Sequence, residues 1–279
     1  MKRHFIHLAI VATAISFAAC NSTTPAEQQT PPVEEENTII NDSTAVVILE
    51  NNGIKLTEVV SPEFPDAQLT LTTPSNGSDV AAGEVPFSFT VESASYQLGA
   101  QTADADIKSC ANSSKGQHIH LILNNQPYSA HYESTFTQAL EPGSYTALAF
   151  ISRSYHESLK HQGAATLSQF TVGGAVLEPI DLEAPHLFYS RPKGSYEGED
   201  INKVMLDFYL INTHISEEGN YVAVSIDDAA VFKITKWAPY FMEGLTVGEH
   251  TIKIQLMDKN DNPIEGPFNT EERAFSLVQ

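Results

Sequence analysis

Short runs in which apolar and polar residues alternate fill most of the chain. In the run YVAVSI, at 221–226, every second residue is a branched apolar one. A period of two is typical of a β-strand that buries one face. Two further runs, at 45–49 and 54–60, flank Asn52 and Gly53, a pair that favours a tight hairpin turn. The pattern therefore predicts an all-β protein.

An internal repeat organises these runs. The run HIHLIL, at 118–123, matches YVAVSI at an offset of 103 residues, and the next apolar strand recurs at an offset of 105. Short strands and a repeat of about 100 residues are typical of tandem immunoglobulin-like β-sandwiches. We expect an N-terminal sandwich over 44–173 and a C-terminal sandwich, a spacer or protein-contact module, over 174–279. The boundary falls at two adjacent glycines.

The first twenty residues have the pattern of an export signal. A basic start precedes an apolar stretch over 5–19, and small residues stand directly before Cys20. This arrangement resembles the lipobox of bacterial lipoproteins, which implies cleavage before Cys20 and acylation of that residue. We expect a signal peptide over 1–19, then the lipidated cysteine and a disordered, flexible stalk over 20–43. The lipid would be the protein's contact with the bacterial outer membrane.

Charge and motifs narrow the function. The chain holds 15 basic and 35 acidic residues among 279, a formal net charge of −20, which disfavours nucleic acid as a partner. It contains no G-x-S-x-G elbow, no P-loop and no G-x-G-x-x-G motif. These observations favour a non-catalytic binding protein.

The repeat also assigns faces to strand 118–123. Carrying over the register of 221–226 points Ile119 and Leu121 into the sandwich, and His118 and His120 outward. The following strand then turns further apolar residues, Phe150 among them, to the same outer face. Exposed apolar patches are uncommon, so we expect a cover, either the segment 93–117 or the N-terminal hairpin, or a ligand.

Histidines gather in the N-terminal sandwich. His118 and His120 share a strand face, and His131 and His156 follow along the same domain. Neutral imidazole is a good ligand for zinc or copper, so these four residues form a candidate metal site. The alternative is that they are structural and hydrogen-bond to backbone or glutamate groups.

A second polar stretch follows. Arg153, Ser154, Tyr155 and Lys160 bring cations and hydroxyl groups together in a chain poor in basic residues. Such groups suit an anion or a protein partner, because arginine forks onto carboxylate or phosphate. The alternative is a polar loop at the end of the sandwich.

The same stretch offers the residue types of a hydrolase. Ser154 or Ser158 stands close to His156 and Glu157, which superficially supplies a nucleophile, a base and an acid. Geometry and not sequence proximity decides such a triad. A hydrolase therefore remains the second alternative, after metal binding.

Three runs carry a family resemblance: CANSSKGQHIH at 110–120, PYSAHYE at 127–133 and RSYHESLK at 153–160. They resemble a group of Bacteroidota envelope lipoproteins that are often labelled phosphopeptide-binding proteins. The resemblance covers 70–173 and implies a bacterial outer-membrane lipoprotein, but no particular activity. We expect its partner to be another envelope protein, a peptide or a small anionic ligand. We interpret the chain as a lipid-anchored bacterial envelope protein acting as a non-catalytic binding or interaction module.

Overall fold

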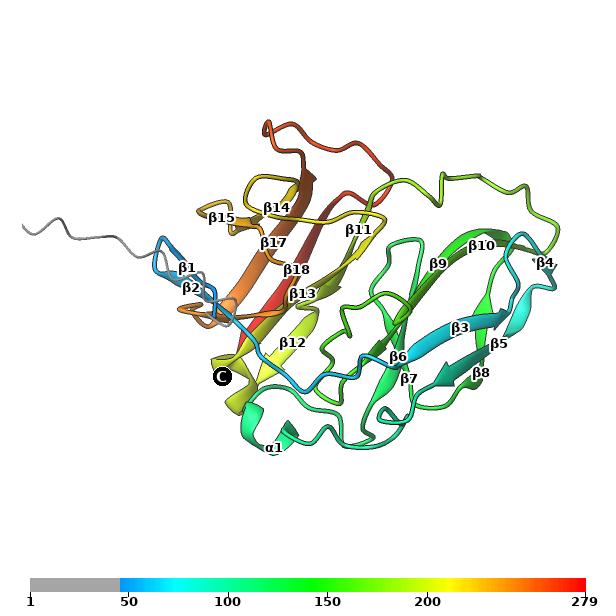
Figure 1. Ribbon diagram of the computed structural model, residues 1–279, viewed down its shortest axis with the longest axis horizontal. Coiled ribbons are helices and arrows are strands. Elements are labelled where there is room, and N and C mark those ends of the chain that lie inside the picture. Colours follow the sequence, from blue (N-terminus) through cyan, green and yellow to red (C-terminus); the bar gives the residue numbers. More distant parts are fainter. Residues whose placement is uncertain (1–45) are drawn as a thin grey trace, which may run out of the picture. The chain divides into compact units, whose positions relative to one another are not determined.

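A computed structural model describes residues 46–279 (Figure 1). The predicted signal peptide, Cys20 and the predicted stalk lie outside the described residues. The described residues form tandem immunoglobulin-like β-sandwiches, as the alternating pattern predicts. Their helices are two short turns, α1 (Ala105–Lys108) and the 3-10 helix η1 (Gly198–Asn202). No helix in this part of the chain is long and apolar enough to cross a membrane.

The first sandwich packs a five-stranded sheet on a three-stranded sheet. The five-stranded sheet runs, in spatial order, β4 (Asp79–Val80), β10 (Ala165–Val172), β9 (Gly143–Ser152), β6 (His118–Leu123) and β7 (Ser129–His131). The smaller sheet contains β3 (Gln68–Thr73), β5 (Gly83–Glu92) and β8 (Thr135–Leu140). Apolar residues from both sheets, including Phe87, Phe89, Ile119 and Phe170, form one buried core between them.

The second sandwich packs two five-stranded sheets. One runs β1 (Ile48–Asn51), β2 (Ile54–Glu58), β16 (Tyr240–Glu243), β13 (Val204–Ile211) and β11 (His186–Arg191). The other runs β12 (Gly194–Glu197), β18 (Thr270–Val278), β17 (Gly248–Met257), β14 (Tyr221–Ile226) and β15 (Ala230–Ile234). Its core is separate from that of the first sandwich.

The strand pairing confirms the internal repeat. β6 pairs with β9 in the first sandwich, and β14 pairs with β17 in the second. In β14, Val222, Val224 and Ile226 are fully buried while Ala223 and Ser225 are half-buried, the alternation expected of a strand with one core face. β6 differs because all of its residues are buried. Its outer face must therefore be covered.

The N-terminal hairpin corrects one expectation. β1 and β2 form the predicted two-residue turn, with positive φ at Asn52 and Gly53. The hairpin belongs to the second sandwich, however, because β2 pairs with β16. The chain then crosses to β3 of the first sandwich through residues 59–67, which we call the strap (Figure 1).

The residues that cover the outer face of β6 also differ from the expectation. Ile122, Leu148 and Phe150, which leave the first core on the outer side, pack against Phe188 and Tyr209 of the second sandwich. The rings of Phe150 and Tyr209 stack with centroids 4.9 Å apart. The C-terminal sandwich therefore supplies the main apolar cover of this face, in place of segment 93–117 or the hairpin, which the sequence predicts. Which segment covers this face depends on how the two domains pack together, and that packing joins residues far apart in the sequence.

Candidate functional site

Three histidines meet where β6 enters the contact between the sandwiches. His118 and His120 lie on the outer face of β6 and are fully buried, while Ile119 and Leu121 enter the first core. The predicted orientation of the two histidines is thus confirmed. His156 comes from the loop after β9 and is half-buried.

The ring nitrogens of these histidines converge. His118 Nε2 lies 2.8 Å from His120 Nε2 and 2.9 Å from His156 Nδ1. One nitrogen from each ring falls within 4.8 Å of the others, an arrangement that can surround a metal ion. The structure therefore brings together three of the four predicted ligands.

A backbone contact fixes the tautomer of His118. Its Nδ1 lies 2.8 Å from the Gly116 carbonyl oxygen, which can only accept, so Nδ1 carries the proton and Nε2 has the lone pair. Ligating histidines characteristically donate their second N–H in this way. His120 Nδ1 is buried and has no hydrogen-bond partner among the described residues. Hydrogen bonds among the three histidines therefore do not provide a partner for every ring nitrogen of the cluster.

Backbone strain places the third histidine. His156 has φ of 66°, a left-handed conformation that is rare for a residue with a side chain. Its N–H donates to the Arg153 carbonyl at 2.9 Å, closing a tight turn. Such strain costs of the order of 1–3 kcal/mol and persists only where the surroundings hold it.

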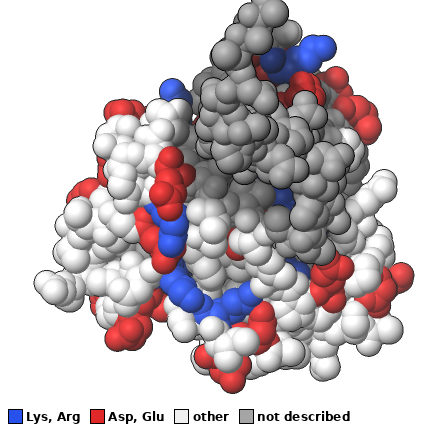
Figure 2. Space-filling model, turned by 60° about the vertical axis from the view of Figure 1, so that its left-hand side comes forward, with Lys and Arg blue, Asp and Glu red and all other residues white. Residues whose placement is uncertain are grey.

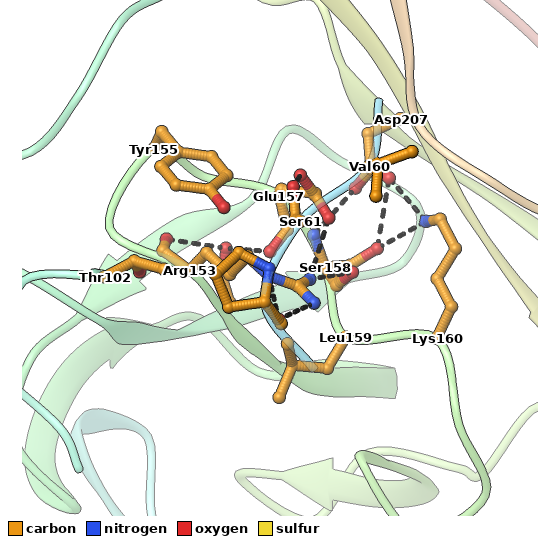
Figure 3. A network of polar contacts seen from close by, with 12 residues as sticks. Val60, Ser61, Thr102, Arg153, Tyr155, Glu157, Ser158, Leu159, Lys160 and Asp207 are labelled. Carbon is orange, nitrogen blue, oxygen red and sulfur yellow. Dashed lines mark hydrogen bonds and ion pairs between the residues drawn. The ribbon is translucent and has the colours of Figure 1, made fainter. Parts of the chain in front are cut away.

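The surroundings that hold this turn are drawn in Figure 3. Arg153 Nη1 donates to Glu157 Oε1 at 2.8 Å, and its Nε and Nη2 donate to the Pro62 carbonyl of the strap. Ser61, also in the strap, donates to Glu157 Oε2 at 2.6 Å. Both charged side chains are almost completely buried. The guanidinium therefore braces the turn that carries His156.

Lys160 is likewise paired with a buried carboxylate. Its Nζ lies 2.5 Å from Asp207 Oδ1 of β13, and Asp207, which is fully buried, also accepts from the Ser158 hydroxyl at 3.1 Å (Figure 3). This ion pair joins the loop of the first sandwich to the second sandwich.

These contacts correct the predicted anion site of Arg153, Ser154, Tyr155 and Lys160. Both cations are paired with carboxylates, Ser154 exchanges hydrogen bonds with Thr102, and Tyr155 donates to Asp104 at 3.0 Å. The sequence pattern identified a polar cluster that already contains Glu157, but it did not indicate that Asp207 of the other sandwich pairs with Lys160.

A groove of about 320 Å³ passes beside this network, between the strap and the loops at 153–161 and 236–239. It is lined by three cations, and each is paired with a carboxylate: Arg153 with Glu157, Lys160 with Asp207, and Lys236 with Glu58. The groove therefore offers an anion no uncompensated cation among the described residues.

Burial keeps the clustered imidazoles neutral. It lowers the pKa of His118 to about 4 and that of His156 to about 2, and holds the pKa of His120 well below its ordinary value. The positive charges of Arg191 and Lys193, from the second sandwich, lower the pKa of all three further. Neutral imidazole is the form that binds metal.

His131 lies apart from the cluster. Its Nε2 contacts the Ser129 hydroxyl at 2.7 Å, and its ring stacks on Phe136 with centroids 3.4 Å apart. It is not among the residues that could surround one ion with His118, so its inclusion among the ligands is not supported.

The contacts of His156 also bear on the hydrolase alternative. That reading needs His156 against a serine and a carboxylate. Its Nδ1 instead faces His118, while Ser158 contacts Asp207 and Glu157 contacts Arg153. The neighbouring residue types do not form a triad.

Sequence reasoning missed the groups around the cluster. Tyr128 stacks on His120 with ring centroids 3.6 Å apart, and Lys193 Nζ lies 3.7 Å above the Tyr128 ring. Arg191 Nη1 donates to the Tyr155 carbonyl, one residue before His156. The sequence does contain a signal for these groups: two basic residues, Arg191 and Lys193, stand within three positions in a chain that has few basic residues.

The surface charge follows the acidic composition. On the face shown in Figure 2, acidic side chains are spread widely, and several basic side chains lie in a curved band with acidic neighbours while others stand apart from it. Lys55 and Glu243, for example, form an exposed pair at 2.5 Å. Because the charges of such a pair cancel locally, the net negative charge of the chain dominates its electrostatic field at long range.

Comparison with known proteins gives likenesses of low similarity. No family model and no curated protein matches the chain. Similar solved structures include fibronectin(III)-like modules of Clostridium thermocellum CbhA (14% identity, TM-score 0.26, covering 75% of this chain and 94% of that one). A Bacteroides ovatus protein, SGBP-B of the mixed-linkage glucan utilization locus, solved with a heptasaccharide, has 9% identity and a TM-score of 0.21, with 82% and 71% covered. The extracellular domain of a hybrid two-component system from B. thetaiotaomicron has 12% identity and a TM-score of 0.25, with 83% and 44% covered. At these values the likenesses carry no argument about function.

Proposed function

We propose that this protein is a lipid-anchored envelope protein whose first sandwich binds a transition-metal ion, zinc or copper, without catalysing a reaction. His118, His120 and His156 are the ligands. The observation that carries the proposal is the convergence of three imidazole nitrogens within 4.8 Å.

Hydrogen bonding alone explains the cluster poorly. With its proton on Nδ1, His118 Nε2 can accept one hydrogen bond, yet nitrogens of both other rings lie within 2.9 Å of it. A metal ion would bind the lone pair of each ring and remove the conflict among the three facing nitrogens.

The donor set indicates the class of metal. Three neutral nitrogen ligands suit zinc or copper, whereas magnesium and calcium prefer oxygen. Three protein ligands leave a coordination position for an outside group, and the half-buried His156 is on the accessible side of the cluster. The chain's own contribution is to hold the nitrogens in place through Gly116 and the Arg153 brace.

The lipid anchor rests on the sequence. The lipobox-like segment ending at Cys20 supports acylation and an outer-membrane location, and the resemblance of 110–120 and 153–160 to Bacteroidota envelope lipoproteins supports the same location. These two of the three runs that carry the resemblance also contain the three proposed ligands. The anchor would keep the metal-binding sandwich at the envelope.

A metal titration tests the proposal. The full chain, purified in detergent without a polyhistidine tag and stripped of metal, would compete with a chromophoric chelator for zinc and for copper. We expect one tight site, weakened at least tenfold in His118→Gln and His156→Gln. His131→Gln is the matched control and should keep the affinity. Equal affinity in all four proteins would refute the proposal.

A further inference from the structure

Arg191, at the end of β11, is a buried cation without a carboxylate. Its side chain is 6% exposed, and none of the ion pairs among the described residues includes it. Nη1 donates to the Tyr155 carbonyl at 3.2 Å, and Nε has no hydrogen-bond partner. Buried charges are normally paired, because desolvation of an unpaired one is expensive. This guanidinium faces the Tyr196 ring, with Cζ 5.7 Å from the ring centroid, but no carboxylate, which makes it a candidate to bind an anion.

Arg191 stands beside the histidine cluster. Among the described residues, the one hydrogen bond of its side chain is to the residue that precedes His156. Lys193 approaches from the same chain segment, donates from Nζ to the Tyr128 carbonyl at 2.7 Å, and covers the ring that stacks on His120. Both cations thus lie beside residues that contact the histidine cluster.

The charges there do not balance. The neighbouring cations Arg153 and Lys160 are neutralised by Glu157 and Asp207, whereas Arg191 and Lys193 have no carboxylate partner in the described part of the chain. A metal ion on the three histidines would add further positive charge. An anion would therefore offset positive charge here both with and without the metal.

We propose that Arg191 and Lys193 hold a small anion with a planar carboxylate edge, either carbonate or a short carboxylate, next to the histidine cluster. The Nε edge of a guanidinium receives such an edge through two parallel hydrogen bonds. The ligand is small because His118, His120 and Arg191 are all closed off from solvent, and it enters past the half-buried Lys193 and His156.

The anion has a second role that rests on the proposed function. Placed between the cations and the histidines, it would occupy the coordination position that the protein leaves open on the metal. Metal and anion would then bind cooperatively, each raising the affinity of the other by the same factor.

The anion site is tested first without metal. Thermal unfolding of the chelator-treated full chain would be measured in acetate, bicarbonate and chloride at equal ionic strength and pH. We expect one or both of the carboxylate-edge anions, relative to chloride, to raise the midpoint by about 5 °C at roughly 100 times its dissociation constant. The comparison of acetate with bicarbonate distinguishes an organic carboxylate from carbonate.

Variants decide which residues are responsible. The rise should be lost in Arg191→Gln and reduced at least several-fold in Lys193→Gln, a half-buried position where the fold is less at risk. It should persist in Lys259→Gln, an exposed control, and in the His118→Ala/His120→Ala variant. No rise in the wild type, an equal rise in chloride, or an unchanged rise in Lys193→Gln would overturn the proposal.

Metal affinity separates this inference from the proposed function. In the presence of the effective anion we expect zinc or copper affinity to rise about tenfold in the wild type and to stay unchanged in Lys193→Gln. Tight metal binding with no effect of any anion would overturn the anion site and leave the metal site standing. An anion-dependent midpoint without metal binding would overturn the proposed function alone.

Discussion

The buried ion pair between the sandwiches makes the sharpest stability prediction. Replacing Asp207 by alanine leaves the Lys160 ammonium without a counter-ion in a place where its side chain is 9% exposed. It also removes the acceptor of the Ser158 hydroxyl. Breaking one partner of a buried pair costs about 3–5 kcal/mol, because the remaining charge is desolvated and uncompensated.

The size of this effect can be bracketed. For a domain of this length, each kcal/mol moves the thermal midpoint by about 2–4 °C, so Asp207→Ala should lower it by roughly 6–20 °C. The double variant Lys160→Met/Asp207→Leu removes both charges and should lose far less. Glu243→Ala, which breaks an exposed pair with Lys55, should cost no more than about 1 kcal/mol.

Urea denaturation followed by tryptophan fluorescence suits the measurement. The chain has one tryptophan, and the Trp237 ring lies 5.6 Å from Lys160 Nζ while its Nε1 donates to the Phe208 carbonyl. The probe therefore reports on the contact itself. A loss below about 1 kcal/mol in Asp207→Ala, or equal losses in the single and double variants, would show that the pair is not buried and desolvated as described.

Three further predictions concern other parts of the chain. Gly116 has φ of 87°, and a Cβ there would lie 2.3 Å from a backbone oxygen. Gly116→Ala should therefore weaken metal binding about 10–100-fold. Gly174→Ala is the control and should not weaken it, because Gly174 has a similar φ of 73° but open space around it. Burial lowers the pKa of His250, but its hydrogen bonds to a backbone carbonyl and to Asp227 outweigh this and raise it above 6.5. The stability from the protonated ring is then complete below about pH 6.5 and lost as pH rises through the raised pKa. Urea titrations should therefore show the deficit of His250→Gln shrinking as the pH rises above about 6.5; a deficit that grows would contradict this. Cys20→Ser should abolish incorporation of labelled palmitate and release the protein from membranes, and continued labelling would exclude that residue as the anchor.

The strand pattern could be predicted because it is local. The alternation in 221–226 and its offset to 118–123 identify β14 and β6, and the repeat carries the facing of His118 and His120 from one to the other. The turn at Asn52 and Gly53 is equally local. Each of these features depends on residues that are neighbours in sequence.

The partners of those strands could not be predicted. The pairing of β2 with β16 joins residues about 185 apart, and nothing in either strand specifies the other. Asp207 lies inside the apolar strand β13, which indicates that a cation is buried against its carboxylate. The sequence does not indicate which cation this is. Arg191 belongs to the second sandwich and reaches the first only through their packing.

The central claim is that His118, His120 and His156 hold a metal ion, and metal analysis tests it most directly. The full chain would be purified in detergent without a polyhistidine tag and measured by mass spectrometry for zinc and copper, beside His118→Ala/His120→Ala and His131→Ala. We predict a near-stoichiometric amount of one metal in the wild type and in His131→Ala, and its loss from the double variant while circular dichroism shows the fold retained. No metal after loading, or the same metal content in the double variant, would contradict the claim and make the histidines structural.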